Sequence, residues 1–309
     1  MSTLLITHPA CLEHLTPMGH PERPDRLRAI ERMLENERFQ TLAREQAQAA
    51  ALETIALCHP MDYIETVRDA TPSDGLVRLD ADTTISPGSF EAALRAAGGG
   101  VHAVDEVVAG RVSNAFVATR PPGHHTETAR PMGFCLFNNA AIAARYAQKR
   151  HGIDHAAIVD FDVHHGNGSQ DIFWSDKTVM YCSTHQMPLY PGTGARNERG
   201  AHDTVVNAPL SPGDGGAQFR EAFESTILPR LRNFQPELIV ISAGFDAHQR
   251  DPLANLNLLE ADFLWATQKI MEVAQTSANG RVVSMLEGGY DLEGLANSAV
   301  AHVSALMQG

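Results

Sequence analysis

The alternation of short apolar runs with longer segments of helical periodicity is the feature that most restricts how this chain can fold. The apolar runs end in polar or glycine residues and have the length of buried strands, whereas the segments between them are long enough for helices. This order predicts right-handed β-α-β crossovers onto a central, mainly parallel sheet in a three-layer α/β/α fold. We expect strands at 4–7, 114–119, 156–161, 179–183, 204–207, 238–242 and 282–286, and helices at 26–37, 90–109, 138–150, 218–231, 260–274 and 292–307.

The absence of repeats, low-complexity tracts and long linkers favours a single domain over 1–309. A formal net charge of -13 would repel phosphate backbones and anionic membranes, so neither nucleic acid nor a membrane is an expected partner. Met1 leads into the short apolar run Leu4-Leu5-Ile6 without a basic segment, and no run approaches the ~18 apolar residues of a membrane span, so we expect a protein that is neither exported nor embedded. The four scattered cysteines form no C-x-x-C pair, which favours a reducing, cytoplasmic location. These features do not distinguish a monomer from an oligomer.

The residues that follow four of the expected strands carry unusual chemistry. Open parallel sheets place ligand sites just beyond the carboxyl ends of their strands, so groups that are distant in the chain can converge there. The four segments are RPPGHH at 120–125, DVHHGNG at 162–168, AGFD at 243–246 and EGGY at 287–290.

Asp162 and His164 are two residues apart at one of these strand ends, and extended backbone would point both side chains to the same side. Alone, the pair could equally be a turn residue and a surface imidazole. Asp246 follows a second, fully apolar strand, which is an odd place for a merely solvating carboxylate. Two carboxylates and one imidazole leave an open position for water, as a catalytic zinc site requires, and Fe²⁺ is also chemically acceptable.

The pair His124-His125 follows two prolines and a glycine, which can hold adjacent imidazoles in a tight turn. An isolated pair is more often metal-ligating or exposed than catalytic. Beside a hydrolytic metal site, however, imidazoles can take a proton from water and donate one to a leaving amine. We assign Asp160 to His124 and Asn167 to His125 as the partners that fix their tautomers. The alternatives are a cation ligand for Asp160, which can coexist with the first role, and a turn residue for Asn167.

Aromatic side chains supply two further candidate roles. Tyr290 follows two glycines, which allow a loop to bring the phenol over the site as an oxyanion donor, although packing is the commoner role of a tyrosine. Gly133, Phe134 and Tyr190 can line an apolar channel around a methylene chain, and burial in the core is the alternative for the aromatics.

These segments, in this order, resemble the zinc-dependent histone deacetylases, enzymes of the arginase/deacetylase fold, and especially class II and its bacterial relatives. The resemblance runs from HPERP at 20–24 through RPPGHH at 120–125, GFC at 133–135, DFDVHHGNG at 160–168, YPGTG at 190–194, GFD at 244–246 and EGGY at 287–290. Chance agreement of so many ordered motifs is negligible.

The resemblance implies the same core roles as the residues themselves: zinc bound by Asp162, His164 and Asp246, the His124-His125 pair, and Tyr290 polarising the scissile carbonyl. It also implies potassium sites, which the residues alone did not indicate, at Asp160, Asp162, His164 and Ser183 and, farther out, at Phe173, Asp176 and Val179. The channel residues Gly133, Phe134 and Tyr190, with Leu253, match the family's acyl-lysine tunnel, and Arg23 matches the arginine beneath its acetate-release region.

Two departures from the family pattern refine this expectation. Class I members of the family have aspartate at the position of Asn167, whereas class II members have asparagine, as this chain does. The neutral amide would leave His125 less cationic and better suited as the general base. Leu253 stands where polyamine-selective members have glutamate, which removes an attraction for a distal ammonium.

We therefore expect a zinc-dependent amidohydrolase that removes acetyl or related acyl groups from acetyl-lysine-like substrates. The alternatives are an acetylpolyamine or other small-amide hydrolase and, from another class, a catalytically silent acyl- or metal-binding scaffold. A two-metal arginase-like hydrolase needs more bridging carboxylates than the sequence offers.

Overall fold

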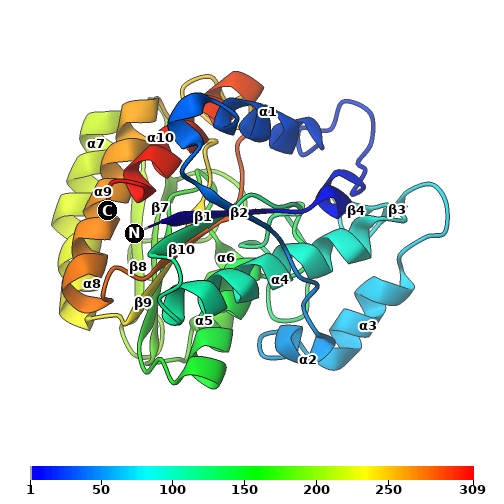
Figure 1. The fold of residues 1–309 in the computed structure, drawn as a ribbon, viewed down its shortest axis with the longest axis horizontal. Coiled ribbons are helices and arrows are strands. Elements are labelled where there is room, and N and C mark those ends of the chain that lie inside the picture. Colours follow the sequence, from blue (N-terminus) through cyan, green and yellow to red (C-terminus); the bar gives the residue numbers. More distant parts are fainter. Residues whose placement is uncertain (1) are drawn as a thin grey trace.

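The computed structural model describes residues 2–309 and contains an eight-stranded sheet in the order β2-β1-β5-β10-β9-β6-β7-β8 (Figure 1). Every neighbouring pair of strands in this sheet is parallel. All seven strands expected from the apolar runs are present, so the prediction of a parallel sheet is confirmed. The strands are β1 Thr3–Thr7, β2 Ala43–Gln46, β5 Asn114–Val117, β6 Ala156–Asp160, β7 Val179–Gln186, β8 Val205–Leu210, β9 Leu238–Ala243 and β10 Val282–Leu286.

The expected helices are also present, with one interruption. The segment expected as a helix over 218–231 is α7 Gly216–Ala222 and α8 Leu228–Phe234, joined by a π-helical turn over Phe223–Ile227. The other expected helices are α1 Asp25–Leu34, α4 Ser89–Val108, α5 Asn139–His151, α9 Glu260–Ser277 and α10 Leu292–Leu306.

Several short elements were not expected from the sequence. The edge strand β2 has the sequence AREQ and is mostly exposed, so it has no apolar run to mark it. The others are the 3₁₀ turns Pro9–Leu12 and Glu37–Phe39, the helices α2 Leu52–Ile55, α3 Met61–Asp69 and α6 Asn167–Phe173, and an antiparallel hairpin of β3 Val77–Arg78 with β4 Thr84–Ile85.

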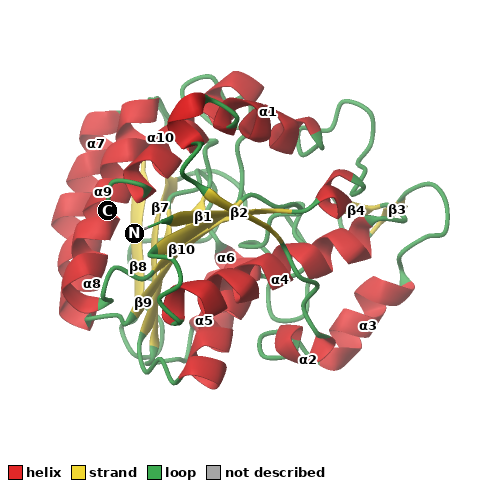
Figure 2. Cartoon of the chain, in the orientation of Figure 1, coloured by secondary structure: helices red, strands yellow, loops and turns green. Residues whose placement is uncertain are grey.

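The sheet separates two hydrophobic cores, and helices cover both of its faces (Figure 2). Along β9, Ile239 and Ile241 enter the core under α1 and α7 to α10, whereas Leu238 and Val240 enter the core under α4 and α5. This alternation is the period-two pattern of a strand buried on both faces. The three-layer α/β/α prediction is therefore confirmed.

The four strands that precede the chemical motifs are adjacent in the middle of the sheet, in the order β5-β10-β9-β6. Because they are parallel, their carboxyl ends open on the same edge, and the loops that follow them meet there. Among the helices of residues 2–309, none combines the length and apolarity that a membrane crossing requires.

Candidate active site

Asp162, His164 and Asp246 meet at the carboxyl edge of β6 and β9. His164 Nδ1 lies 3.3 Å from Asp162 Oδ1 and 3.0 Å from Asp246 Oδ2. Backbone amides hold the far oxygens, because Gly288 N donates to Asp162 Oδ2 at 2.8 Å and Val163 N donates to Asp246 Oδ1 at 2.9 Å. Three loops thus aim one imidazole nitrogen and two carboxylates at a common point.

This group fits a divalent metal ion. One ligand atom from each residue lies within 4.8 Å of the other two, and all three residues are buried. Burial and the charge of Asp162 raise the pKa of Asp246, while His124 and His164 outweigh burial and lower the pKa of Asp162. Two buried carboxylates are costly without a compensating cation, and one imidazole with two carboxylates suits Zn²⁺ or Fe²⁺.

The surrounding backbone leaves no room for side chains where the carboxylates lie. A Cβ atom at Gly244 would overlap the Asp162 carboxylate, and one at Gly288 would overlap the carboxylates of both Asp162 and Asp246. Against the cost of burial, these carboxylates raise the pKa of His164 to about 10. Metal binding would therefore have to displace a proton from this imidazole.

His124 is held by a carboxylate on each side. Its Nδ1 lies 3.0 Å from Asp160 Oδ2, as expected from the sequence, and its backbone N donates to Glu287 Oε2 at 3.2 Å. Burial opposes the charged form, but Asp162, Asp160 and Glu287 outweigh it and raise the pKa of His124 well above its ordinary value. The geometry therefore favours an imidazolium at this position.

His125 has the opposite electrostatic environment. Its Nδ1 lies 2.9 Å from Asn167 Oδ1, the expected partner, which is a neutral amide. Burial, together with the charges of His124 and His164, lowers the pKa of His125 well below its ordinary value. The two adjacent imidazoles thus have their pKa values pushed apart, which is the usual mark of an acid and a base in one site.

Tyr290 lies on the loop between β10 and α10. Asp251 fixes this loop, because its Oδ2 accepts hydrogen bonds from Tyr290 N at 2.7 Å and Asp291 N at 3.3 Å. The Phe134 ring centroid is 5.9 Å from that of Tyr290. Burial and the charge of Asp246 raise the pKa of Tyr290 well above its ordinary value, so the phenol is a donor at neutral pH.

His125, His164 and Tyr290 line a cavity of about 230 Å³. Its wall also contains Gly133, Phe134, Tyr190 and Leu253, the residues expected to form the tunnel. Asp82 also lines the cavity but was not expected, because it precedes a two-residue strand without any apolar signal. The complete lining is Asp82, His125, Gly133, Phe134, His164, Leu189, Tyr190, Leu253 and Tyr290.

The arginine beneath Tyr290 is Arg26, so the prediction of Arg23 for this place is wrong. The Arg23 side chain is 43% exposed and lies 3.5 Å from Asp25. Arg26 is fully buried, donates to Gly289 O at 2.6 Å and lies 5.0 Å from the Tyr290 ring centroid. The reason is helical phase: α1 turns its Arg26 face toward the core, whereas Arg23 precedes the helix at the surface.

The residues expected at potassium sites lie in two places. Asp160 and Ser183 are register partners on β6 and β7, and Ser183 Oγ is 2.9 Å from His185 Nδ1. The outer group, Phe173, Asp176 and Val179, spans the end of α6 and the start of β7. The Asp176 carboxylate is engaged by Thr178 and Arg145, and the Asp176 backbone oxygen accepts a hydrogen bond from Thr204 Oγ1 at 2.9 Å.

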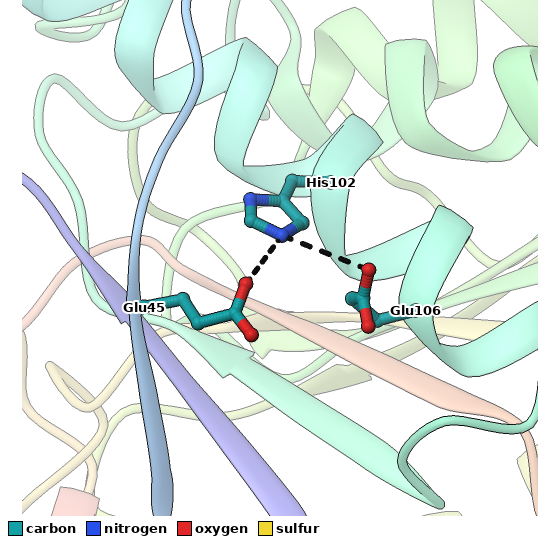
Figure 3. Close-up of side chains that lie close together, drawn as sticks. All are labelled: Glu45, His102 and Glu106. Atoms are coloured by element: carbon teal, nitrogen blue, oxygen red, sulfur yellow. Dashed lines mark ion pairs between the residues drawn. The ribbon is translucent and has the colours of Figure 1, made fainter.

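A second histidine-carboxylate group lies on α4 and the edge strand β2, away from the cavity. His102 Nε2 is 2.7 Å from Glu45 Oε2 and 3.9 Å from Glu106 Oε1 (Figure 3). Arg111 already binds both oxygens of Glu106, at 2.6 and 2.7 Å. Ion pairs within the protein therefore account for this group.

Comparisons with known proteins agree with the site. The histone deacetylase domain model matches residues 20–306. The chain is 42% identical over 300 residues to an uncharacterized protein of Synechocystis, covering 96% of each, and 38% identical to a histone deacetylase-like amidohydrolase of Pseudomonas aeruginosa, covering 88% of this chain and 73% of that protein. A probable deacetylase of Archaeoglobus fulgidus is 38% identical, covering 95% of this chain and 83% of that protein.

A solved structure extends this likeness to the backbone. The crystal structure of the HDA15 HD domain superimposes with a TM-score of 0.94 and 36% sequence identity, covering 99% of this chain and 88% of that one. Its fold and the family match together cover nearly all of the sheet and every strand-end motif. The chain belongs to the histone deacetylase family.

Proposed function

We propose that this protein is a zinc-dependent amidohydrolase that removes acetyl or related short acyl groups from lysine-like amines, releasing acetate and the free amine. The observation that carries the proposal is the cavity of about 230 Å³, whose wall combines aromatic side chains with His164 of the metal group, His125 and Tyr290. A narrow apolar wall suits a methylene chain, and the polar groups suit hydrolysis of an amide at its end.

A zinc ion bound by Asp162, His164 and Asp246 would polarise the acyl carbonyl and acidify a water molecule. His125, kept neutral by its lowered pKa, takes a proton from the attacking water. The Tyr290 hydroxyl donates a hydrogen bond to the carbonyl oxygen as negative charge develops there. The carbon–nitrogen bond then breaks, and the amine leaves with a proton that His124 supplies from its carboxylate-stabilised imidazolium form.

The remaining cation and location assignments belong to the same proposal. Zinc is proposed over Fe²⁺ as the working metal, and potassium is proposed at the inner group of Asp160, Asp162, His164 and Ser183 and the outer group of Phe173, Asp176 and Val179. The four cysteines are free and buried, which supports a cytoplasmic location. The proposed partners are acetylated lysine peptides or small acetylated amines, with no nucleic acid or membrane.

An acetylpolyamine hydrolase is the second candidate, and one observation favours it. Asp82 places a carboxylate in the cavity wall, where it could attract a distal ammonium. Against this, Leu253 and Leu189 are apolar members of the same wall, and Asp82 Oδ1 already accepts a hydrogen bond from Gly133 N at 3.0 Å. We therefore favour the lysine-like substrate.

Acetate release by the zinc-loaded protein tests both candidates. An acetyl-lysine peptide and an acetylated diamine are compared at equal concentrations, with the Asp246→Ala variant as the background. Faster release from the peptide, lost in the variant, is the expected result. Preference for the diamine would select the second candidate, and no release from either substrate would refute deacetylation of both.

A further inference from the structure

The side-chain amide of Asn167 lies between the imidazole of His125 and the carboxylate of Glu127. Asn167 Nδ2 donates to Glu127 Oε1 at 2.8 Å and lies 3.3 Å from Met132 Sδ. Its Oδ1 lies 2.9 Å from His125 Nδ1. Asn167 is 5% exposed, so protein atoms rather than water satisfy this amide.

Donor and acceptor chemistry determines the orientation of this amide. A carboxylate and a thioether can only accept hydrogen bonds, so the two amide hydrogens of Asn167 must point toward Glu127 and Met132. The amide oxygen then faces His125, and His125 Nδ1 must carry the proton that it accepts. The lone pair of a neutral His125 is thereby left on Nε2.

The backbone around this chain of hydrogen bonds is tightly braced. Gly168 N and Ser169 N of α6 donate to His124 O at 3.0 and 3.2 Å. Three residues beyond His125 along the same segment, Thr128 N and Oγ1 both donate to Asp171 Oδ2 of α6, at 2.9 and 2.7 Å. Glu127 and Asn167 therefore come from two segments that hold each other in place.

His124 and His125 differ in how each imidazole reaches a carboxylate. His124 contacts the Asp160 carboxylate directly, and the Tyr181 hydroxyl donates to the same oxygen at 3.0 Å. His125 reaches a carboxylate only through the amide of Asn167. Without Glu127, the amide could rotate by half a turn and offer hydrogens to His125, which would favour the wrong tautomer.

We propose that Glu127 is a positioning residue that sets the tautomer of His125 through Asn167. The inference rests on the proposed function, since it assigns Glu127 to the base of that reaction. Glu127 does not line the cavity and does not belong to the metal group, so the route by which it can act on His125 is the amide of Asn167.

Single and combined substitutions of Glu127 and Asn167 give the kinetic test. Glu127→Gln should lower kcat by about 10–100-fold with KM unchanged, which is the usual effect of losing a hydrogen-bond partner that orients a site residue. Asn167→Asp alone places two carboxylates against each other and should lower kcat further. In the Glu127→Gln background, however, Asn167→Asp brings the carboxylate directly to His125, and kcat should recover to at least about tenfold above that of Asn167→Asp alone.

The protonated nitrogen can also be read without turnover. In the zinc-loaded, ¹⁵N-histidine-labelled protein, His125 is assigned by the signals that disappear in His125→Ala. Long-range ¹⁵N–¹H spectra should show the proton on Nδ1 in the wild type and a mixture of tautomers in Glu127→Gln. Asp171→Asn is the matched control: it removes a neighbouring carboxylate of the same brace and should leave the tautomer unchanged.

Glu127→Gln with wild-type kcat and a pure Nδ1-protonated tautomer would overturn the proposal, as would a double variant no faster than Asn167→Asp alone. Failure of the wild type to release acetate would instead refute the proposed function, and the tautomer spectra would still decide the role of Glu127.

Discussion

Two groups of one histidine and two carboxylates can be compared directly in this molecule. In Asp162, His164 and Asp246, the carboxylates are at most 1% exposed, and within residues 2–309 no Lys or Arg side chain pairs with them. In the group of His102 on the surface, Glu45 is 46% exposed and Glu106 is paired with Arg111. The same three residue types thus form a buried group that suits a metal ion in one place and a partly exposed set of ion pairs in the other. Burial and the lack of an arginine partner, not composition, distinguish the candidate metal group.

The largest expected effect comes from breaking the buried group. Asp246→Ala removes one of three ligands and should abolish stoichiometric zinc binding and lower acetate release by at least ~10³-fold, since the metal contributes several kcal/mol to the transition state. Zinc content by elemental analysis and initial rates measure this. A variant that keeps one zinc per chain and wild-type turnover would contradict the assignment of the buried group.

Removing a donor beside the metal group tests whether the cavity acts by electrostatic stabilisation. Tyr290→Phe keeps the ring but loses the hydroxyl, so kcat should fall by the equivalent of about 3–4 kcal/mol with zinc content unchanged. Steady-state kinetics on an acetyl-lysine peptide measure the loss. Unchanged turnover would exclude the hydroxyl from the reaction.

The buried carboxylate of Glu22 is compensated by protein cations, because Arg120 and Arg26 both pair with it. Burial would raise its pKa, but Arg120 and Arg26 prevail and lower it from 4.5 to about 2. Between these pH values the unfolded chain binds the proton and the folded chain does not. Glu22 therefore makes its full contribution to the free energy of unfolding above pH 4.5. This contribution, about 3 kcal/mol, is lost as the pH falls from 4.5 toward 2.

Urea unfolding of the wild type and Glu22→Gln at a series of pH values isolates this contribution, since other buried groups cancel between the two proteins. The variant should be less stable at pH 7 and lose less stability on acidification. Parallel pH profiles for the two proteins would show that Glu22 has no lowered pKa.

The smallest effect is expected at the surface group. His102→Ala should change the free energy of unfolding by at most about 1 kcal/mol, because partly exposed ion pairs contribute little. Zinc content should remain one per chain and acetate release should be unchanged. A fall in metal content of this variant would reverse the comparison between the two groups.

The sequence predicts most of the sheet because its central strands are buried on both faces and therefore carry continuous apolar runs. It predicts the metal group, both histidine partners and Tyr290 for a related reason: each lies within a few residues of such a strand end. The edge strand β2 and the strand β3 have no comparable signal, since their side chains are largely exposed, and β4 is only two residues long.

The errors and omissions share a different cause. Choosing Arg26 rather than Arg23 required the phase of α1 relative to the sheet, which the spacing of the two arginines does not contain. Asp82 and Asp251 reach the site through loop packing, as does Glu127 through its contact with Asn167. Contacts of this kind depend on where distant segments meet, and no local periodicity records them.

The order β5-β10-β9-β6 has a consequence for how the molecule opens. The loops that carry the site residues follow the four innermost strands, whereas β2 and β8 are the edge strands of the sheet. Fraying at the margins can expose backbone amides to deuterium without displacing any ligand atom, because each inner strand keeps a neighbour on both sides. Separating the four strands that carry the site loops requires the innermost part of the sheet to come apart, so fraying at the edges leaves the frame of the site paired.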